Sequence, residues 1–152
     1  MPRHRVLTPL RWSDMDAYGH VNNVQFLRLL EDARVIAFAA TGTDDGGSVV
    51  DTGLVVARSE IEYLAQLVYR PEPVAIDMWV TRVAGASFEM GYEVCDERGR
   101  DGGDWVVYAR ASTTLVTYDL ARDRPRRLDE SERKRLEAWR DGPVAWRYRR
   151  PE

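Results

Sequence analysis

One long apolar helix near the start of the chain constrains the fold more than any other feature of the sequence. Its apolar residues recur at the three- and four-residue spacing of one helical face: Phe26, Leu30, Ala33, Ala37 and Ala40. Asn22 is a suitable N-cap, Gln25 follows it as in a capping box, and Gly42 is a natural end. The polar positions along the helix form only a narrow stripe: Gln25, Arg28 and Asp32. We therefore expect most of this helix to be buried.

Strand-like alternation dominates the rest of the chain as far as residue 118. A short alternating stretch precedes the helix at 5–12. After the helix, apolar and polar residues alternate with period two in further segments at 58–63, 74–81, 88–94 and 105–118. This order of elements belongs to the α+β class, and only the sheet is available to cover the helix. It predicts the hot-dog fold, in which an antiparallel sheet of about five strands wraps one long central helix.

The length of 152 residues fits a single domain spanning 1–152, with its core at about 5–118. Residues 119–152 form a charged C-terminal extension, in which 131–139 is expected to be a short helix. Residues 1–118 carry 11 basic and 17 acidic side chains, whereas the extension carries 11 basic and 8 acidic ones. The basic excess in the extension predicts either a solvated surface or a local site for an anion such as a substrate phosphate.

Composition excludes several classes of protein. The net charge of −3 and the pI of about 5.5 argue against a nucleic-acid-binding protein. The longest apolar runs are far too short to cross a membrane, and the first residues lack the apolar core of a secretion signal. Cys95 is the only cysteine, so neither a disulfide framework nor a cysteine-rich zinc site is expected. His4 and His20 are too few for most metal sites, and we expect a cytoplasmic protein without a bound metal.

The densest group of reactive side chains lies in Asp14-Met15-Asp16-Ala17-Tyr18-Gly19-His20-Val21-Asn22-Asn23, directly before the helix. Asp, Gly and Asn are also the residues that a turn and a helix N-cap require, so one interpretation is structural. The other interpretation is catalytic. Unpaired amide groups at the helix start would stabilise an oxyanion, while a neighbouring carboxylate or imidazole attacks the substrate or activates water.

The same segment resembles a known family. Arg11-Trp12-Ser13-Asp14-Met15-Asp16, Gly19-His20-Val21-Asn22-Asn23 and Leu30-Glu31-Asp32-Ala33-Arg34 are similar to the signature of 4-hydroxybenzoyl-CoA thioesterase-like hot-dog proteins. The resemblance implies an acyl-CoA thioesterase that releases a carboxylic acid and free CoA, uses no cofactor, and forms a homodimer or homotetramer. The exposed sheet edges of so small a protein also favour association. An acyl-ACP thioesterase and a non-catalytic protein that binds or senses acyl thioesters are the alternatives.

The resemblance also implies roles for individual residues. Asp16 matches the catalytic carboxylate, acting as nucleophile or general base, and the backbone N–H of Asn23 matches the oxyanion donor. His20 is a second candidate for activating water, since Asp16 and His20 also match a loop of plant-type acyl-ACP thioesterases. That family has a catalytic asparagine where this chain has Tyr18. The residues expected to contact the substrate are Tyr18, Gly19, Val21 and Asn22.

Two further carboxylates are expected to be structural. Asp14 is interpreted as a turn residue, and Glu31 as the partner of Arg34 in an ion pair along the helix. One lineage of hot-dog thioesterases uses a helix carboxylate, which leaves Glu31 as an alternative catalyst. A hot-dog dehydratase would need a histidine and a separate acid across the pocket, and only His20 is available.

Arginines are the expected ligands for the phosphates of CoA, because a guanidinium binds phosphate in a bidentate manner. Of the 22 basic residues only Lys134 is a lysine. The basic C-terminal extension is the first place where we expect such a contact. Arg82 is the one arginine close to the turn at 84–87, where related proteins often bind phosphate.

Overall fold

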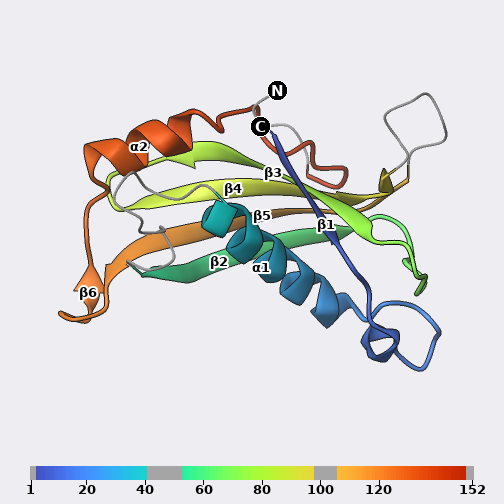
Figure 1. The fold of residues 1–152 in the computed structure, drawn as a ribbon. Coiled ribbons are helices and arrows are strands. Elements are labelled where there is room, and N and C mark those ends of the chain that lie inside the picture. The colour runs from blue at the N-terminus through green and yellow to red at the C-terminus, as the bar shows by residue number, and fades with distance from the viewer. Residues whose placement is uncertain (1–2, 41–52, 98–105, 150–152) are drawn as a thin grey trace.

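The structure, a computed structural model, describes residues 3–40, 53–97 and 106–149 (Figure 1). In chain order its elements are β1 (His4–Thr8), the 3-10 helix η1 (Trp12–Asp14), α1 (Asn23–Ala40), β2 (Leu54–Tyr63), β3 (Val74–Val83), β4 (Ser87–Cys95), β5 (Val107–Asp119), β6 (Arg124–Pro125) and α2 (Glu130–Glu137). The helix and strand segments predicted from periodicity are confirmed. The first strand is shorter than predicted, because Pro9 follows Thr8 and has no N–H to continue a ladder.

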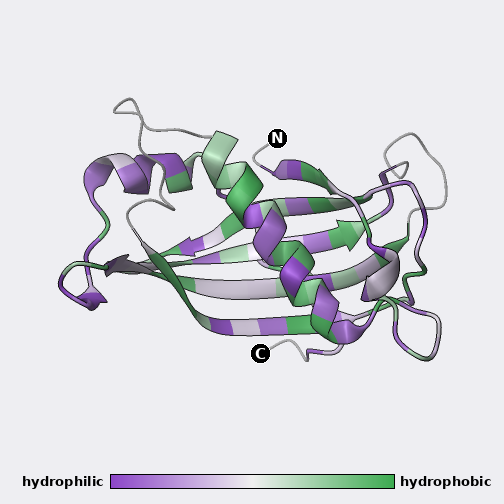
Figure 2. Cartoon of the chain, turned by 60° about the horizontal axis from the view of Figure 1, so that its bottom comes forward, coloured by the Kyte–Doolittle hydropathy of each residue, from purple (hydrophilic) through white to green (hydrophobic). Residues whose placement is uncertain are grey.

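All strand pairs are antiparallel, and the strand order across the sheet is β1-β3-β4-β5-β2, with the two-residue β6 paired to β5. The predicted meander is present in β3, β4 and β5, but β2 pairs with β5 rather than with the strand that follows it. The helix α1 lies obliquely across one face of this sheet (Figure 2). The predicted α+β class and the hot-dog arrangement of one central helix against an antiparallel sheet are therefore confirmed.

The helix packs on this face because large apolar side chains alternate along β3 and β4. The inner-face residues of these strands are at most 1% exposed: Val74, Ile76, Met78, Val80, Phe88, Met90, Tyr92 and Val94. From α1, Phe26, Leu29, Leu30, Ala33 and Ala37 join the same contiguous core. Burying one large apolar side chain of this kind stabilises the fold by about 1.5–3 kcal/mol.

The expectation that most of α1 is buried is wrong. Val24, Leu27, Val35 and Ile36 are 64%, 42%, 49% and 50% exposed, because a single sheet can cover only one side of a helix. The helix ends at Ala40, and the predicted stop at Gly42 lies outside the described residues. No helix in the described ranges is long and apolar enough to span a membrane.

The C-terminal extension folds onto the sheet. Its predicted short helix is confirmed as α2, which begins after the N-cap Asp129 and buries Leu136 in the core. Beyond α2, Arg140 pairs in parallel with Val80 of β3. The chain then crosses the sheet face opposite α1, which we call the outer face (Figure 1).

Hydrogen bonds and ion pairs hold this crossing segment, residues 140–149, on the outer face. The indole of Trp79 donates a hydrogen bond of 2.7 Å to the carbonyl of Gly142. The guanidinium of Arg110 donates to the carbonyl of Ala145 at 2.9 Å. The carboxylate of Glu62 accepts the backbone N–H groups of two residues near the end of the segment: Arg147 and Tyr148.

Candidate active site

Backbone hydrogen bonds join the two ends of the loop before α1. Met15 and Val21 form an antiparallel bridge, and the N–H of Asp16 donates to the carbonyl of His20 at 2.8 Å. Gly19 has φ of +78°, a left-handed conformation that glycine adopts without a steric cost, and this lets the loop reverse. The loop therefore brings the two candidate catalytic side chains, Asp16 and His20, to the same end of the helix.

The start of α1 leaves one backbone donor free. The side chain of Asn22 caps the helix by accepting the N–H of Val24 at 3.0 Å, as predicted. Gln25 does not complete a capping box, since its side chain instead accepts hydrogen bonds from arginines: Arg28 and Arg11. Within the described chain, no group accepts a hydrogen bond from the N–H of Asn23. An unpaired N–H at the positive end of a helix dipole is a ready oxyanion donor.

Asp14 fastens this loop to the helix. Its side chain is fully buried and accepts hydrogen bonds from the backbone N–H of Arg11 and from Arg28 of α1, at 2.9 and 2.7 Å. The carbonyl of Asp14 accepts the N–H of Asn22 at 2.9 Å. Burial opposes ionisation of Asp14, but the hydrogen bonds from Arg11 and the charge of Arg28 outweigh it and hold the pKa of the carboxyl below its ordinary value.

A cavity of about 430 Å³ opens beside the loop and the helix start. The predicted site residues among those that line it are Asp16, Tyr18, His20, Val21 and Asn23. The structure thus brings together both predicted catalytic side chains and the residue with the free N–H. Gly19 and Asn22, predicted to contact substrate, do not line the cavity. Gly19 instead reverses the loop and Asn22 caps the helix.

One carboxylate oxygen of Asp16 accepts a hydrogen bond within the loop, and the other accepts none from the described residues. Its Oδ1 accepts the backbone N–H of Tyr18 at 2.9 Å, which fixes the orientation of the carboxylate. Nothing in the described residues donates a hydrogen bond to its Oδ2. The side chain is half-buried, so this oxygen can meet a substrate or a water molecule at the cavity wall.

Sequence reasoning missed the opposite wall of the cavity. This wall is formed by Phe26 of α1 and by the end of β2 and the loop after it: Tyr63, Ala65, Gln66 and Leu67. The carbonyl of Leu67 accepts the N–H of Val21 at 2.7 Å, which joins the two walls. These residues lie about 40 positions beyond the motif, and the only local signal was the place of Tyr63 at the end of a predicted strand.

Tyr63 links β2 to the helix start. Its hydroxyl donates to the carbonyl of Asn23 at 3.0 Å, and its ring meets Phe26 edge-on with 5.4 Å between centroids. Burial raises the pKa of the Tyr63 hydroxyl above its ordinary value, so the group stays protonated and keeps donating at neutral pH.

One prediction about a charged residue is corrected, and the expected phosphate contact of Arg82 stays a prediction. The expected ion pair between Glu31 and Arg34 is absent from the described structure, where Arg34 donates to the hydroxyl of Tyr92 at 3.3 Å. Glu31 is exposed and does not line the cavity that holds Asp16. Arg82 also lies elsewhere, in a second cavity on the outer face that the C-terminal segment helps to form. Neither Arg82 nor that segment reaches the cavity beside Asp16.

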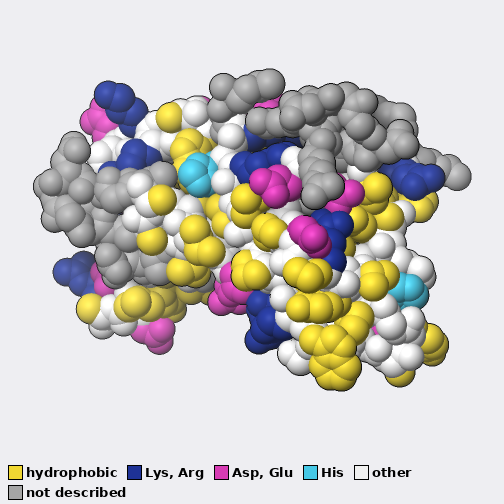
Figure 3. Space-filling model, turned by 45° about the vertical axis from the view of Figure 1, so that its right-hand side comes forward, with side chains coloured by type: hydrophobic (Ala, Val, Ile, Leu, Met, Phe, Trp, Pro, Cys, Tyr) yellow, Lys and Arg dark blue, Asp and Glu magenta, His cyan; other side chains and the backbone are white. Residues whose placement is uncertain are grey.

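The chemistry of this cavity is that of a hydrolytic site. It combines a carboxylate, an imidazole and a backbone N–H at a helix start with aromatic and aliphatic walls. Within the three described ranges, no group of three or more His, Cys, Asp or Glu residues is placed to hold a metal ion. Figure 3 turns forward the end of the molecule that carries the loop before α1, and hydrophobic side chains gather in patches on this surface.

The sequence and the fold are similar to those of known proteins. The sequence profile of the thioesterase-like superfamily matches residues 10–137. The structure resembles the PA2801 protein of Pseudomonas aeruginosa, a candidate thioesterase, with 31% identity, a TM-score of 0.71 and coverage of 86% of this chain and 95% of that one. It also resembles a thioesterase from Thermus thermophilus solved with coenzyme A and Zn, with 28% identity, a TM-score of 0.72 and coverage of 93% and 97%. No curated protein matches the chain.

A third structure shows the fold alone. It is an aspartate-to-asparagine mutant of 4-hydroxybenzoyl CoA thioesterase complexed with 4-hydroxybenzoyl CoA, 16% identical, with a TM-score of 0.75 over 90% of this chain and 99% of that one. The profile match spans most of the sequence, and the relative in Pseudomonas aeruginosa is aligned over almost its whole length. The chain therefore belongs to the thioesterase-like superfamily and is a thioester hydrolase with the hot-dog fold.

Proposed function

We propose that this protein is an acyl-CoA thioesterase whose active site is the cavity beside the start of α1. One observation carries the proposal: the carboxylate of Asp16 and the free N–H of Asn23 belong to the same cavity wall. The carboxylate supplies a nucleophile or a general base, and the helix start supplies an oxyanion donor. These are the two groups that hydrolysis of a thioester needs most.

The reaction consumes one water molecule and needs no cofactor beyond the CoA of the substrate. As a general base, Asp16 takes a proton from water while the water oxygen bonds to the thioester carbon, and the C–S bond then breaks. As a nucleophile, the Asp16 carboxylate bonds to the thioester carbon and expels the CoA thiolate, and water then hydrolyses the resulting anhydride to release the acid and restore the carboxylate. In both cases the N–H of Asn23 binds the carbonyl oxygen as it gains charge. An ordinary thiol has a pKa near 8.5, so the leaving thiolate needs no strong general acid.

His20 is the second candidate for activating water. His20 lines the same cavity, and its backbone carbonyl accepts the N–H of Asp16 at 2.8 Å. We expect His20→Gln to lower turnover less than loss of the Asp16 carboxylate does. A larger loss in His20→Gln would transfer the role of base to the imidazole.

The substrate class rests on a relative that was solved with a ligand. The Thermus thermophilus thioesterase was solved in complex with coenzyme A. In this chain, Phe26, Tyr63 and Leu67 provide an apolar wall suited to an acyl group. An acyl-carrier-protein substrate presents the same thioester, so a comparison of both carriers belongs in the assay.

We also propose that the active unit is a homodimer joined along β2. This strand pairs with β5 on one side only within the described chain, and an unpaired strand edge invites a second copy. Tyr63 ends β2 and lines the cavity, so a partner at this edge would lie beside the acyl-binding wall.

The test is a thiol-release assay on short, long and aromatic acyl-CoAs and on acyl-ACP, with wild type, Asp16→Asn and Glu31→Gln. We expect turnover of at least one acyl-CoA and a loss of about 10²-fold or more in Asp16→Asn. Glu31→Gln is the matched control, because it neutralises an exposed carboxylate of α1 outside the cavity.

Each other outcome selects an alternative. Undiminished turnover in Asp16→Asn contradicts a catalytic role for Asp16. A loss of turnover in Glu31→Gln alone assigns the catalytic carboxylate to Glu31 of α1. Tight acyl-CoA binding with no turnover on any substrate identifies a protein that senses acyl thioesters rather than an enzyme.

A further inference from the structure

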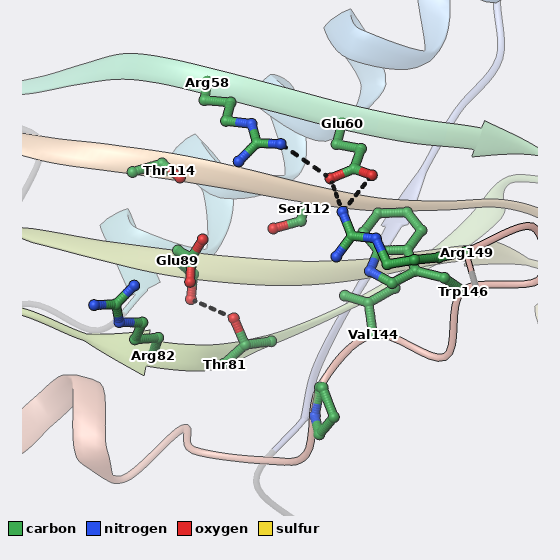
Figure 4. Close-up of a pocket in the computed structure, with 11 residues that line it drawn as sticks. Arg58, Glu60, Thr81, Arg82, Glu89, Ser112, Thr114, Val144, Trp146 and Arg149 are labelled. Atoms are coloured by element: carbon green, nitrogen blue, oxygen red, sulfur yellow. Dashed lines mark hydrogen bonds and ion pairs between the residues drawn. The ribbon is translucent and has the colours of Figure 1, made fainter. Parts of the chain in front are cut away.

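The outer face of the sheet holds a second cavity, of about 280 Å³, on the side opposite α1 (Figure 4). Its floor comes from β2, β3, β4 and β5, and its wall from the C-terminal segment that crosses the sheet. That wall lies beyond residue 137, where the match to the thioesterase-like superfamily ends. The cavity is therefore completed by a part of the chain that the superfamily profile does not include.

Two irregularities in the sheet turn arginines into this cavity. In β3, Val80 and Val83 both pack on the core although they are three positions apart, and residues an odd number of positions apart face opposite sides of a regular strand. The register shift between Val80 and Arg82 accounts for this, and it leaves both Thr81 and Arg82 lining the outer cavity. A bulge of this kind re-aims side chains and often occurs beside functional sites.

β2 repeats the arrangement. Leu54 and Ile61 both pack against the core although they are seven positions apart, again an odd number, and the register shifts between Val56 and Arg58. The shift directs Arg58 and Glu60 to the outer cavity. Two bulges on two strands thus place polar side chains at one point of the outer face.

The cavity has more positive than negative side chains. Arg58, Arg82 and Arg149 line it together with Glu60 and Glu89. The carboxylate of Glu60 is shared by Arg149 and Arg58, the latter at 3.6 Å. In the described structure Arg82 makes no ion pair or hydrogen bond through its side chain. This holds even though Glu89 is its cross-strand neighbour.

Hydroxyl groups complete the floor. Ser112 and Thr114 come from β5 and have no hydrogen-bond partner for their hydroxyls within the described ranges, and Thr81 donates to the carbonyl of Glu89 at 3.3 Å. Trp146 and Val144 close one side (Figure 4). Unpaired guanidinium and hydroxyl donors around one small polar cavity are the groups that bind the oxygens of an anion.

We propose that this cavity binds a small phosphate-bearing anion, held by Arg82, Arg58 and the hydroxyls of Ser112 and Thr114. Of the two carboxylates that line the cavity, Glu60 has arginine partners and Glu89 has none among the described residues, so Glu89 opposes a dianion and favours a phosphate ester whose organic part carries a hydroxyl donor, as the ribose of AMP does. The site lies on the other face of the sheet from Asp16, and it does not depend on the proposed thioesterase mechanism.

The test is isothermal titration calorimetry of the full chain with inorganic phosphate and with AMP at low ionic strength, where charge interactions are least screened. We expect saturable binding with a Kd of about 1 mM or tighter. Arg82→Gln and Arg58→Gln should each weaken it about tenfold or more, and Arg82→Lys should recover part of the loss. Glu89→Gln should tighten the binding of inorganic phosphate.

Arg122→Gln is the matched control, because Arg122 is 70% exposed in its side chain, as is Arg58, and has one ion pair of 3.9 Å outside the cavity. Binding of AMP in preference to phosphate identifies an ester as the occupant, and the reverse identifies the free ion. The proposal is overturned by the absence of saturable binding of either probe, or by equal weakening in Arg122→Gln and Arg82→Gln. None of these measurements uses thioester hydrolysis, so their outcome is independent of the proposed function.

Discussion

At the scale of single residues, Asp14 and Asp16 show how two neighbouring carboxylates acquire different tasks. Asp14 is fully buried and occupied by donors from Arg11 and Arg28, whereas Asp16 is half-buried and keeps one oxygen open at the cavity. The interpretation of Asp14 as structural is supported by these contacts. The role of Asp16 stays a prediction until the assay above is done.

Asp14→Asn should destabilise the protein by about 2–3 kcal/mol, because a charged acceptor of several hydrogen bonds is replaced by a neutral amide. Asp32→Asn is the matched control. Asp32 binds the other end of the Arg28 guanidinium at 2.6 Å, but its side chain is 46% exposed, so its loss should cost less than about 1 kcal/mol. Urea denaturation of both variants measures the difference. Equal effects would show that burial of Asp14 adds nothing to the interaction.

The lowered pKa of Asp14 also predicts a pH dependence. A carboxyl with a pKa lower in the folded than in the unfolded state stabilises the fold above its unfolded pKa, near about 4, and loses this contribution as pH falls through the folded value. The difference in unfolding free energy between wild type and Asp14→Asn should therefore shrink on acidification below about pH 4. Urea titrations at pH 7 and at acidic pH test this, and a constant difference would contradict it.

Cys95 should be unreactive in the folded protein. The residue is buried in β4, and burial raises the pKa of its thiol to about 12, so almost no thiolate is present at neutral pH. As Cys95 is the only cysteine, labelling with a thiol reagent reports on it alone. We expect slow modification in buffer and complete modification in denaturant. Fast labelling of the native chain would mean that β4 opens readily.

At the scale of elements, the close packing of β3 on β4 positions the C-terminal segment. A Cβ built on Gly91 would lie 2.6 Å from the indole of Trp79, and that indole holds the carbonyl of Gly142. Gly91→Ala should therefore displace Trp79, loosen the crossing segment and cost about 1–3 kcal/mol. Gly142→Ala is the control, since nothing lies within 4 Å of its Cβ position. Thermal unfolding distinguishes the two, and equal melting temperatures would contradict the tight contact.

Most elements could be predicted from local patterns, because period-two alternation and helical spacing are properties of adjacent residues. The bulges before Arg58 and Arg82 could not be predicted, since each is visible only as a change in which side chains face the core. The exposed side of α1 was missed for a similar reason. Val35 and Ile36 are apolar, and their exposure depends on how far the sheet extends around the helix.

At the scale of the whole molecule, the strand order could not be derived from the sequence. Neighbours in sequence pair more often than not, yet β2 lies beside β5, at the far side of the sheet from the helix-preceding β1. For the same reason, only one wall of the candidate site could be predicted. Asp16, His20 and Asn23 are close in sequence, but Tyr63 and Leu67 reach the cavity only through the position of β2.

The position of β2 also makes a prediction about assembly. The two outer strands of the sheet are β1, with five residues, and β2, with ten, so β2 offers the longer edge to a second copy. Val56→Lys places a charge on that edge, which is a common way to prevent strand pairing, and should convert a dimer to a monomer. Leu7→Lys is the matched control, because Leu7 on β1 is 43% exposed and Val56 is 47% exposed.

Size-exclusion chromatography with light scattering measures the mass of each variant, and thiol release measures its activity. Because Tyr63 both ends β2 and lines the cavity, dissociation in Val56→Lys should lower activity as well as mass. A wild-type monomer, or dissociation in Leu7→Lys instead, would contradict association along β2. A monomeric Val56→Lys variant with full activity would show that one chain alone completes the site around Asp16.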